Sequence, residues 1–148
     1  MQNSEAMALS VALLAAAGEL TRRIHEGVVA RGFEGLRPAH GFAFTRLAPD
    51  GATVTDLAAH LGVTKQAASQ LVDELVRKGY VERRSHPDDA RSRLIVMTSL
   101  GWACAGAAEA AAVEAVRPWV GVLGERGARA LREQLLLVAP DGPVRPVW

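Results

Sequence analysis

The fold is decided by residues 55–97, which read TDLAAHLGVTKQAASQLVDELVRKGYVERRSHPDDARSRLIVM. A short segment with helical apolar periodicity, 55–61, is followed by Gly62-Val63 and then by a second such segment, 65–78. Two strings rich in strand-forming residues then flank a charged loop. This order of helix, turn, helix and hairpin is that of a winged helix-turn-helix. DNA binding is therefore the leading hypothesis.

Both helices carry recognisable end signals. We expect Thr55 to cap the first helix and Thr64 to cap the second. Gly62 suits the left-handed residue that ends a helix, and Gly79 is expected to end the second one. The second helix then has a continuous apolar stripe, formed by Ala68, Leu71, Val72, Leu75 and Val76.

The opposite face of the second helix carries side chains suited to DNA. They are long or hydroxylated and bear no negative charge, as contacts to base edges and phosphates require. The candidate recognition residues are Thr64, Lys65, Gln66, Ser69 and Gln70. Carboxylates follow only further along, at Asp73 and Glu74. Taken alone, this pattern fits an ordinary amphipathic helix with a solvated face equally well.

The hairpin favours the DNA-binding interpretation. Residues 80–83 alternate as a half-buried strand does, and residues 94–97 form an apolar run of strand length. Basic groups surround the turn between them, and the candidate wing residues are Arg83, Arg84, His86, Arg91 and Arg93. Such a tip can reach a phosphate backbone or a narrow minor groove. Either Asp88 and Asp89 neutralise the arginines, or Asp89 orients Arg91, which we favour.

These strings resemble the multiple antibiotic resistance regulator (MarR) family of bacterial transcription factors. The likeness covers about residues 53–101 and rests on TDLAAHLGVTKQAASQLVDELVRKGYVERR and PDDARSRLIVMTSLG. The second string contains the family's Asp-x-Arg-Ser wing pattern as Asp89-Ala90-Arg91-Ser92. The resemblance implies a homodimer with two winged domains. In it, Arg91 would enter the minor groove, and the helix starting near Thr64 would read the major groove.

Composition is compatible with this interpretation. The chain of 148 residues is 49% hydrophobic but only 5% aromatic, as expected of a helical protein with an additional buried face such as a subunit interface. The net charge is only +1, so phosphate contacts must come from a local basic patch, and residues 77–93 contain one. The single Cys104 cannot form an internal disulfide, and we expect it to be buried and inert.

The segments outside residues 55–97 are expected to be mostly helical. Residues 4–30 form a long helix capped by Ser4, and a second helix starts at Pro38 and runs to about Leu47. Residues 52–54 are expected to pair with the hairpin as a minimal strand. After the wing, Thr98 caps a helix that Pro118 must kink or end.

The predicted fold is mainly α with a small β wing. Its parts are the winged helix-turn-helix at 36–98, dimerisation helices at 4–31 and 99–139, and an extended tail at 140–148. A final helix over about residues 125–138 has a broad apolar surface, which indicates a partner; the alternative is packing on the chain's own core. Trp148 in the tail is a candidate to dock on the partner subunit.

The sequence contains no motif typical of a secreted protein, a membrane protein or an enzyme. The start MQNSEAMALS has no basic region ahead of an apolar core, and no run of about 18 uninterrupted apolar residues occurs. We therefore expect a cytoplasmic protein without a membrane span. There is no glycine-rich phosphate loop, no metal-ligand spacing and no nucleophile–base pair, so we expect no cofactor, no metal and no enzymatic activity.

The resemblance further implies a regulatory pocket between the dimer helices and the winged domain. In many family members a small aromatic acid or other lipophilic compound binds there and weakens DNA binding. Candidate lining residues are His40, Phe44, Trp102 and either Arg22 or His25, each of which also has an ordinary structural interpretation.

Two functions remain. The first is a homodimeric, sequence-specific transcription regulator, expected to be a repressor, which binds a pseudo-palindromic operator and is released by a ligand. The second is a winged-helix module that binds protein and does not read DNA sequence.

Overall fold

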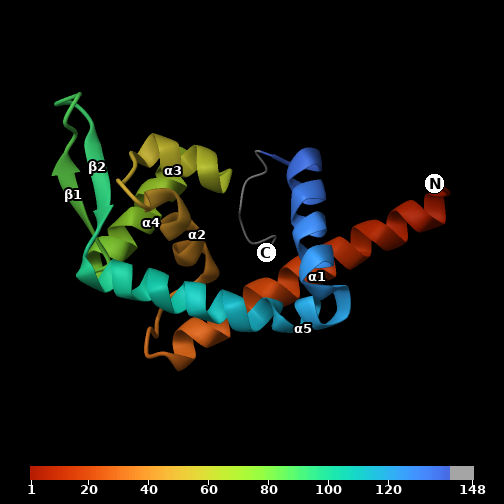
Figure 1. Cartoon of the computed structure of the whole chain (residues 1–148). Coiled ribbons are helices and arrows are strands. Elements are labelled where there is room, and N and C mark those ends of the chain that lie inside the picture. The colour runs from red at the N-terminus through yellow and green to blue at the C-terminus, as the bar shows by residue number, and fades with distance from the viewer. Residues whose placement is uncertain (141–148) are drawn as a thin grey trace.

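The fold is that of a winged helix-turn-helix lobe beside two long helices, as predicted. The computed structural model describes residues 1–140. The elements are α1 (Asn3–Ala30), α2 (Pro38–Leu47), α3 (Val54–Leu61), α4 (Lys65–Arg77), β1 (Val81–Ser85), β2 (Arg93–Met97) and α5 (Ser99–Val138). Helices α2 to α4 and the hairpin form the lobe, and α1 and α5 run beside each other away from it (Figure 1). The predicted tail, with Trp148, lies outside the described residues except for Pro140.

The helix-turn-helix has the expected ends with one correction. Thr53, not Thr55, caps α3: its hydroxyl accepts from the backbone N–H of Asp56, whose carboxylate accepts from the N–H of Thr53, both at 3.1 Å. The prediction of Thr55 was wrong because it ignored this reciprocal three-residue spacing. Gly62 does end α3 in the left-handed region, with φ 63°. Thr64 does cap α4, since its hydroxyl accepts from Ala67 N–H at 3.1 Å.

The wing is an antiparallel hairpin with a third, minimal partner. Val81 pairs with Met97 and Ser85 with Arg93, so β1 and β2 match along their whole length. The expected extra strand is a single bridge between Ala52 and Ile95. Gly51 precedes it with φ +89°, and a Cβ there would lie 2.6 Å from the Ile95 carbonyl oxygen. Only glycine therefore lets the α2–α3 connection approach the wing so closely.

The core of the lobe lies where α2, α3, α4 and the hairpin meet. Its fully buried side chains include Leu47, Leu57, Val72, Leu75 and Ile95. Tyr80 closes the core next to Phe44 and Phe33, with ring centroids 5.9 Å and 6.5 Å apart. The apolar stripe predicted on α4 faces this core, which fixes the rotation of α4 and turns its polar side outward.

Helices α1 and α5 approach each other through small residues. A Cβ on Gly27 would meet the Cβ of Ala111 at 2.6 Å, so no larger residue fits between the two helices at this point. Helix α1 begins one residue earlier than predicted. Gln2, not Ser4, is its N-cap residue, and the Gln2 N–H donates to the Glu5 carboxylate at 2.9 Å.

Helix α5 changes direction at a glycine and not at its proline. Pro118 lies within the helix, whereas Gly124 leaves the helical region with φ 71° and ψ 163°. The prediction that Pro118 must kink or end the helix was wrong about the position. A proline removes one hydrogen bond, whereas a left-handed glycine redirects the backbone itself. The part of α5 after Gly124 matches the predicted final helix and points away from the first part (Figure 1).

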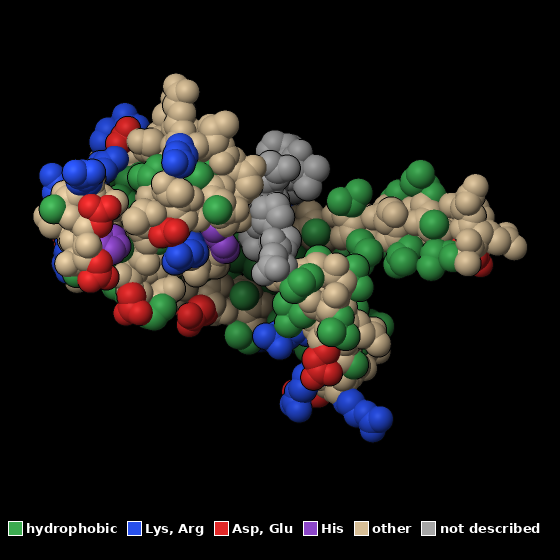
Figure 2. All heavy atoms as spheres, turned by 90° about the horizontal axis from the view of Figure 1, so that it is seen from above, with side chains coloured by type: hydrophobic (Ala, Val, Ile, Leu, Met, Phe, Trp, Pro, Cys, Tyr) green, Lys and Arg blue, Asp and Glu red, His purple; other side chains and the backbone are tan. Residues whose placement is uncertain are grey.

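The start of α1 projects from the rest of the chain and is strongly apolar. Exposed apolar side chains cover it (Figure 2), namely Met7, Leu9, Val11, Leu13 and Leu14. By length and composition α1 could cross a membrane, since its most apolar 18-residue window has a mean hydropathy of 1.2 and is not buried in the single chain. The sequence analysis did not identify this helix as a candidate membrane span, because it looked for an uninterrupted apolar run. A helix covered by a partner subunit has the same composition.

Candidate nucleic-acid interface

Helix α4 presents the five predicted recognition residues at its amino-terminal end. Thr64 is the cap, and Lys65, Gln66 and Gln70 are exposed while Ser69 is half-buried. These positions are opposite the buried stripe, so they share one outward face. Lys65 can neutralise a phosphate, and the two glutamines and the serine can both donate and accept hydrogen bonds at base edges.

The wing tip is organised by Asp89. One carboxylate oxygen accepts from the backbone N–H of Arg91 at 2.9 Å, and the other accepts from the Ser92 hydroxyl at 3.2 Å. Asp89 thus fixes the backbone on which Arg91 stands and does not hold its guanidinium. His86 stabilises the other side of the turn, because its Nδ1 accepts from the N–H of Asp88 at 3.1 Å. Neither Asp88 nor Asp89 forms an ion pair with an arginine among residues 1–140.

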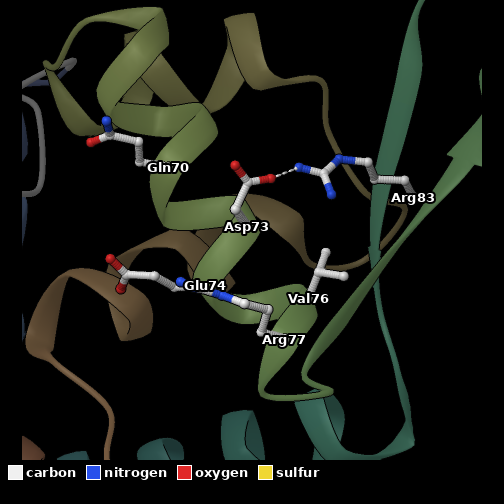
Figure 3. Close-up of a pocket in the computed structure, with 6 residues that line it drawn as sticks. All are labelled: Gln70, Asp73, Glu74, Val76, Arg77 and Arg83. Atoms are coloured by element: carbon white, nitrogen blue, oxygen red, sulfur yellow. Dashed lines mark hydrogen bonds and ion pairs between the residues drawn. The ribbon is translucent and has the colours of Figure 1, made fainter.

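Two of the predicted wing arginines are bound to carboxylates. Arg83 forms an ion pair with Asp73 and so ties β1 to α4 (Figure 3). Arg84 forms one with its strand neighbour Glu82. The sequence analysis grouped both with the wing-tip cations. It missed the Arg83–Asp73 pair because helical and strand periodicities describe each element separately and not how they face each other.

The remaining cations of this region are unneutralised. In the described part of the chain, none of the following lies within 4.0 Å of a carboxylate oxygen: Lys65, Arg77, Lys78, Arg91 and Arg93. The Arg93 guanidinium donates to the Ser85 hydroxyl at 3.4 Å. Lys and Arg side chains gather at the wing end of the molecule (Figure 2). A chain of net charge +1 therefore concentrates positive charge on α4 and the wing, where it can attract a polyanion.

A polar groove of about 620 Å³ separates α4 from the wing. It is lined by Gln70, Asp73, Glu74, Val76, Arg77 and Arg83. Asp73 points across it toward Arg83, while Glu74 points to the other side of α4 (Figure 3). The Arg83–Asp73 pair thus links the helix and the hairpin across this groove.

Glu74 belongs to a second cluster, which joins α4 to α2. His40 is buried, and its Nε2 donates to Glu74 Oε2 at 2.9 Å while its Nδ1 accepts from the backbone N–H of Arg37 at 2.8 Å. Arg37 Nη2 donates to the same Glu74 oxygen at 2.7 Å. Burial lowers the pKa of His40 despite the opposing bond to Glu74, so the imidazole is neutral. The bonds to Arg37 and His40 lower the pKa of Glu74.

A largely apolar cavity of about 650 Å³ lies between α1, α2 and α5. Of the residues predicted to line a pocket, the structure places Phe44, Trp102 and His25 in its wall. It does not place His40 there, because His40 turns toward α4, nor Arg22, which pairs at the surface with Glu19 and Glu26.

The cavity wall also holds residues that the sequence analysis did not select. Its further polar groups are Thr21, Arg37, Thr45 and Glu109. Cys104 is in the wall as well, and burial raises the pKa of its thiol to about 11, as expected of an inert cysteine. Arg37 stands next to Pro38, the predicted helix start, but nothing in the sequence indicates that it borders a cavity.

Comparison with known proteins shows which family shares these features. The model of the MarR family matches residues 42–92, which run from α2 to the wing tip. Rv2011c of Mycobacterium tuberculosis (strain ATCC 25618 / H37Rv), itself uncharacterised, is 37% identical over 82 residues. That match covers 55% of this chain and 56% of the relative, so it spans just over half the length of the relative.

Solved structures match over nearly the whole chain. A MarR family regulator from Rhodococcus sp. RHA1 has a TM-score of 0.73 at 20% identity, covering 97% of this chain and 99% of that one. CouR from Rhodococcus jostii RHA1, bound to p-coumaroyl-CoA, has 0.70 at 22%, covering 96% and 94%. The transcriptional repressor CouR bound to a 23-mer DNA duplex has 0.71 at 25%, covering 89% of each chain. The MarR family model thus matches the winged helix of this chain, and the whole fold is shared with these regulators.

Proposed function

We propose that this protein is a sequence-specific DNA-binding transcription regulator. The observation that carries the proposal is the exposed polar face of α4, a helix in contact with the hairpin whose tip bears the unneutralised Arg91. The amino-terminal end of α4 would read the major groove. Arg91, on a tip held by Asp89, would enter the minor groove. A protein with this role acts where the DNA is, in the cytoplasm.

We further propose that it acts as a homodimer on a pseudo-palindromic operator. The exposed apolar side chains of α1, together with Leu135, Leu136, Leu137 and Val138 of α5, form a surface that a second copy would cover. The predicted dimerisation segments, 4–31 and 99–139, contain both groups. A twofold axis between the copies would place the two α4 helices about 34 Å apart, one turn of DNA.

Repression that a ligand relieves fits the same architecture. The apolar cavity is walled by α1 and α5, which we assign to dimerisation, and by α2, which belongs to the winged helix-turn-helix lobe. A small aromatic or lipophilic ligand that fits only one spacing of the two lobes would shift the dimer away from the DNA-binding arrangement. CouR, which shares the fold, is a repressor in its DNA complex and binds p-coumaroyl-CoA.

The test is a binding titration over a salt series. The duplexes are one from the region upstream of the gene and a scrambled duplex of the same composition. We expect tight binding with a clear preference for the first, and affinity for both that falls steeply as salt rises. Arg91→Ala should weaken binding to both duplexes about tenfold or more and should reduce the salt slope.

Arg46→Gln is the matched control. Arg46 lies in α2 of the same lobe, outside α4 and the wing, and pairs with Asp56 of α3 at 3.6 Å. It should bind as the wild type does. Absence of binding to either duplex at low salt would contradict the proposal and would favour a winged-helix module that binds protein.

A further inference from the structure

We propose that Gln66 and Gln70 each bind an adenine of the operator half-site, and that these two side chains determine its sequence. In the major groove, each carboxamide accepts from the amino group N6 of its adenine and donates to the ring nitrogen N7. The inference rests on the proposed DNA-binding function of α4 and adds to it the bases that this helix selects.

The two glutamines lie on the side of α4 that is farthest from the core. The opposite side is buried and contains Ala68, Leu71 and Leu75. A helix turns by about 100° per residue, so positions 66 and 70 share one line that lies roughly opposite this buried stripe. Both glutamines are exposed. When α4 enters a groove with this side first, they are the side chains that come closest to the base edges.

Both carboxamides are available for a base. Within residues 1–140, neither the Gln66 nor the Gln70 side chain forms a hydrogen bond. The Gln70 carboxamide points away from the Asp73–Arg83 pair (Figure 3). A carboxamide presents a donor and an acceptor side by side. Among the bases, adenine presents the matching acceptor and donor at its major-groove edge, so it can form two hydrogen bonds with one glutamine.

The charged residues of α4 do not compete for these bases. Asp73 continues the line of the glutamines, but its carboxylate is bound to Arg83 and is not free to accept from a cytosine. Arg77 is the last residue of α4, about 16 Å along the helix axis from Gln66, and so lies beyond the end that enters the groove. Lys65 lies to one side of the line and is suited to a phosphate.

The spacing of the two glutamines limits the spacing of the adenines. Four residues of a helix span about 6 Å along its axis, and successive base pairs are about 3.4 Å apart. Gln66 and Gln70 therefore reach base pairs that are separated by at most about two steps. We expect each half-site to contain two adenines at this spacing, on the same strand or on opposite strands.

A base analogue tests the contacts with the unmodified protein. The operator is first selected from a pool of randomised duplexes. 7-Deazaadenine, which pairs with thymine but lacks the N7 acceptor, then replaces the adenines one position at a time, in both half-sites alike. Affinity for each duplex is measured at low salt. We expect a loss of about fivefold or more at two positions of the half-site and of about twofold or less at every other adenine.

Two variants assign the sensitive positions. Gln66→Ala should bind the adenine and the 7-deazaadenine duplex equally at one of them and should keep the wild-type loss at the other. Gln70→Ala should show the reverse. Each truncation removes an exposed side chain without a partner in the described residues, so the fold is kept. Arg46→Gln, outside α4, is the matched control and should lose affinity at both positions as the wild type does.

The outcomes distinguish this inference from the proposed function. A wild type that selects no sequence would contradict the proposed function, and the inference would fall with it. If the wild type does select an operator, half-sites without two adenines that respond to 7-deazaadenine would overturn the inference alone. So would glutamine variants that respond to the analogue at both positions as the wild type does. Loss of one position in each variant is the result that supports it.

Discussion

At the scale of single residues, His40 joins two helices through one buried imidazole. Its neutral form donates to Glu74 and accepts from the backbone of Arg37. Burial, the largest influence, lowers its pKa in the folded protein below the ordinary 6.5. The charged groups that face it are Arg37, Glu74 and Lys78, and the two cations add to the lowering. His40 therefore resists protonation in the folded protein more than in the unfolded chain.

This difference predicts a pH dependence of stability. Well above pH 6.5 the imidazole is neutral in both the folded and the unfolded state, and its contribution to the free energy of unfolding is complete. As pH falls below 6.5, the unfolded chain takes up the proton first, so the free energy of unfolding decreases until the folded pKa is passed. His40→Gln should have a smaller decrease between pH 7.5 and 5.5, measured by urea unfolding. Equal slopes in the two proteins would contradict this role. The pKa values of Asp56 and Glu74 are lowered from the ordinary 3.8 and 4.5, so these two carboxylates affect stability only at a pH below the range of this measurement.

Residues are predictable from sequence where one element decides their environment. The outward face of α4 follows from the apolar stripe on its other side, so Gln66 and Gln70 were placed correctly as exposed side chains. Partners on different elements leave no such periodic signal. Arg83 and Asp73 are ten positions apart across a turn, and His40 and Glu74 are 34 apart. Only the packing of α2, α4 and β1 brings them together.

At the scale of elements, the N-cap of α3 allows a direct test of local structure. Thr53 caps α3 through a reciprocal pair of bonds with Asp56, whereas Thr55 is an exposed residue within the helix. Thr53→Ala should lower the free energy of unfolding by about 1 kcal/mol. Thr55→Ala should change it by less than about 0.5 kcal/mol. Denaturant unfolding of both variants measures the difference, and a larger loss at Thr55 would contradict the assignment.

Element boundaries were predicted best where a glycine or a capping side chain marks them. Gly62 ends α3, and Thr64 and Thr98 cap α4 and α5, as the sequence analysis predicted. The Thr98 hydroxyl accepts from Gly101 N–H at 3.2 Å. For the break in α5, the sequence analysis correctly expected a final helix from about residue 125 but attributed the break to Pro118. Gly124 and Gly121 are both glycines of this helix, and only the tertiary structure determines that Gly124 takes the left-handed conformation.

At the scale of the whole molecule, the projecting start of α1 requires a partner in our account. Leu9 and Leu13 are 49% and 45% exposed on the single chain. Replacing both with glutamate would place charges in the proposed interface, so the variant should sediment near the monomer mass of 15.7 kDa while the wild type sediments near twice that. Duplex binding should weaken as well, because two half-sites are no longer held together.

The matched control replaces the same two leucines with methionine. This change keeps the surface apolar and should leave the dimer intact. A wild-type protein that is monomeric at micromolar concentration would contradict the proposed assembly. The sequence indicated an additional buried surface through its high apolar fraction and the broad apolar face of residues 125–138, but neither pattern determines what covers that surface.

The central claim, that α4 and the wing read DNA sequence in a symmetric dimer, is tested most directly by selection from random duplexes. The full-length protein is bound to a pool of duplexes with a randomised segment of about three turns, and the retained duplexes are sequenced. We predict enrichment of an inverted repeat whose half-site centres lie about 10 base pairs apart. Enrichment of no sequence, with retention governed by salt alone, would contradict sequence reading by this protein.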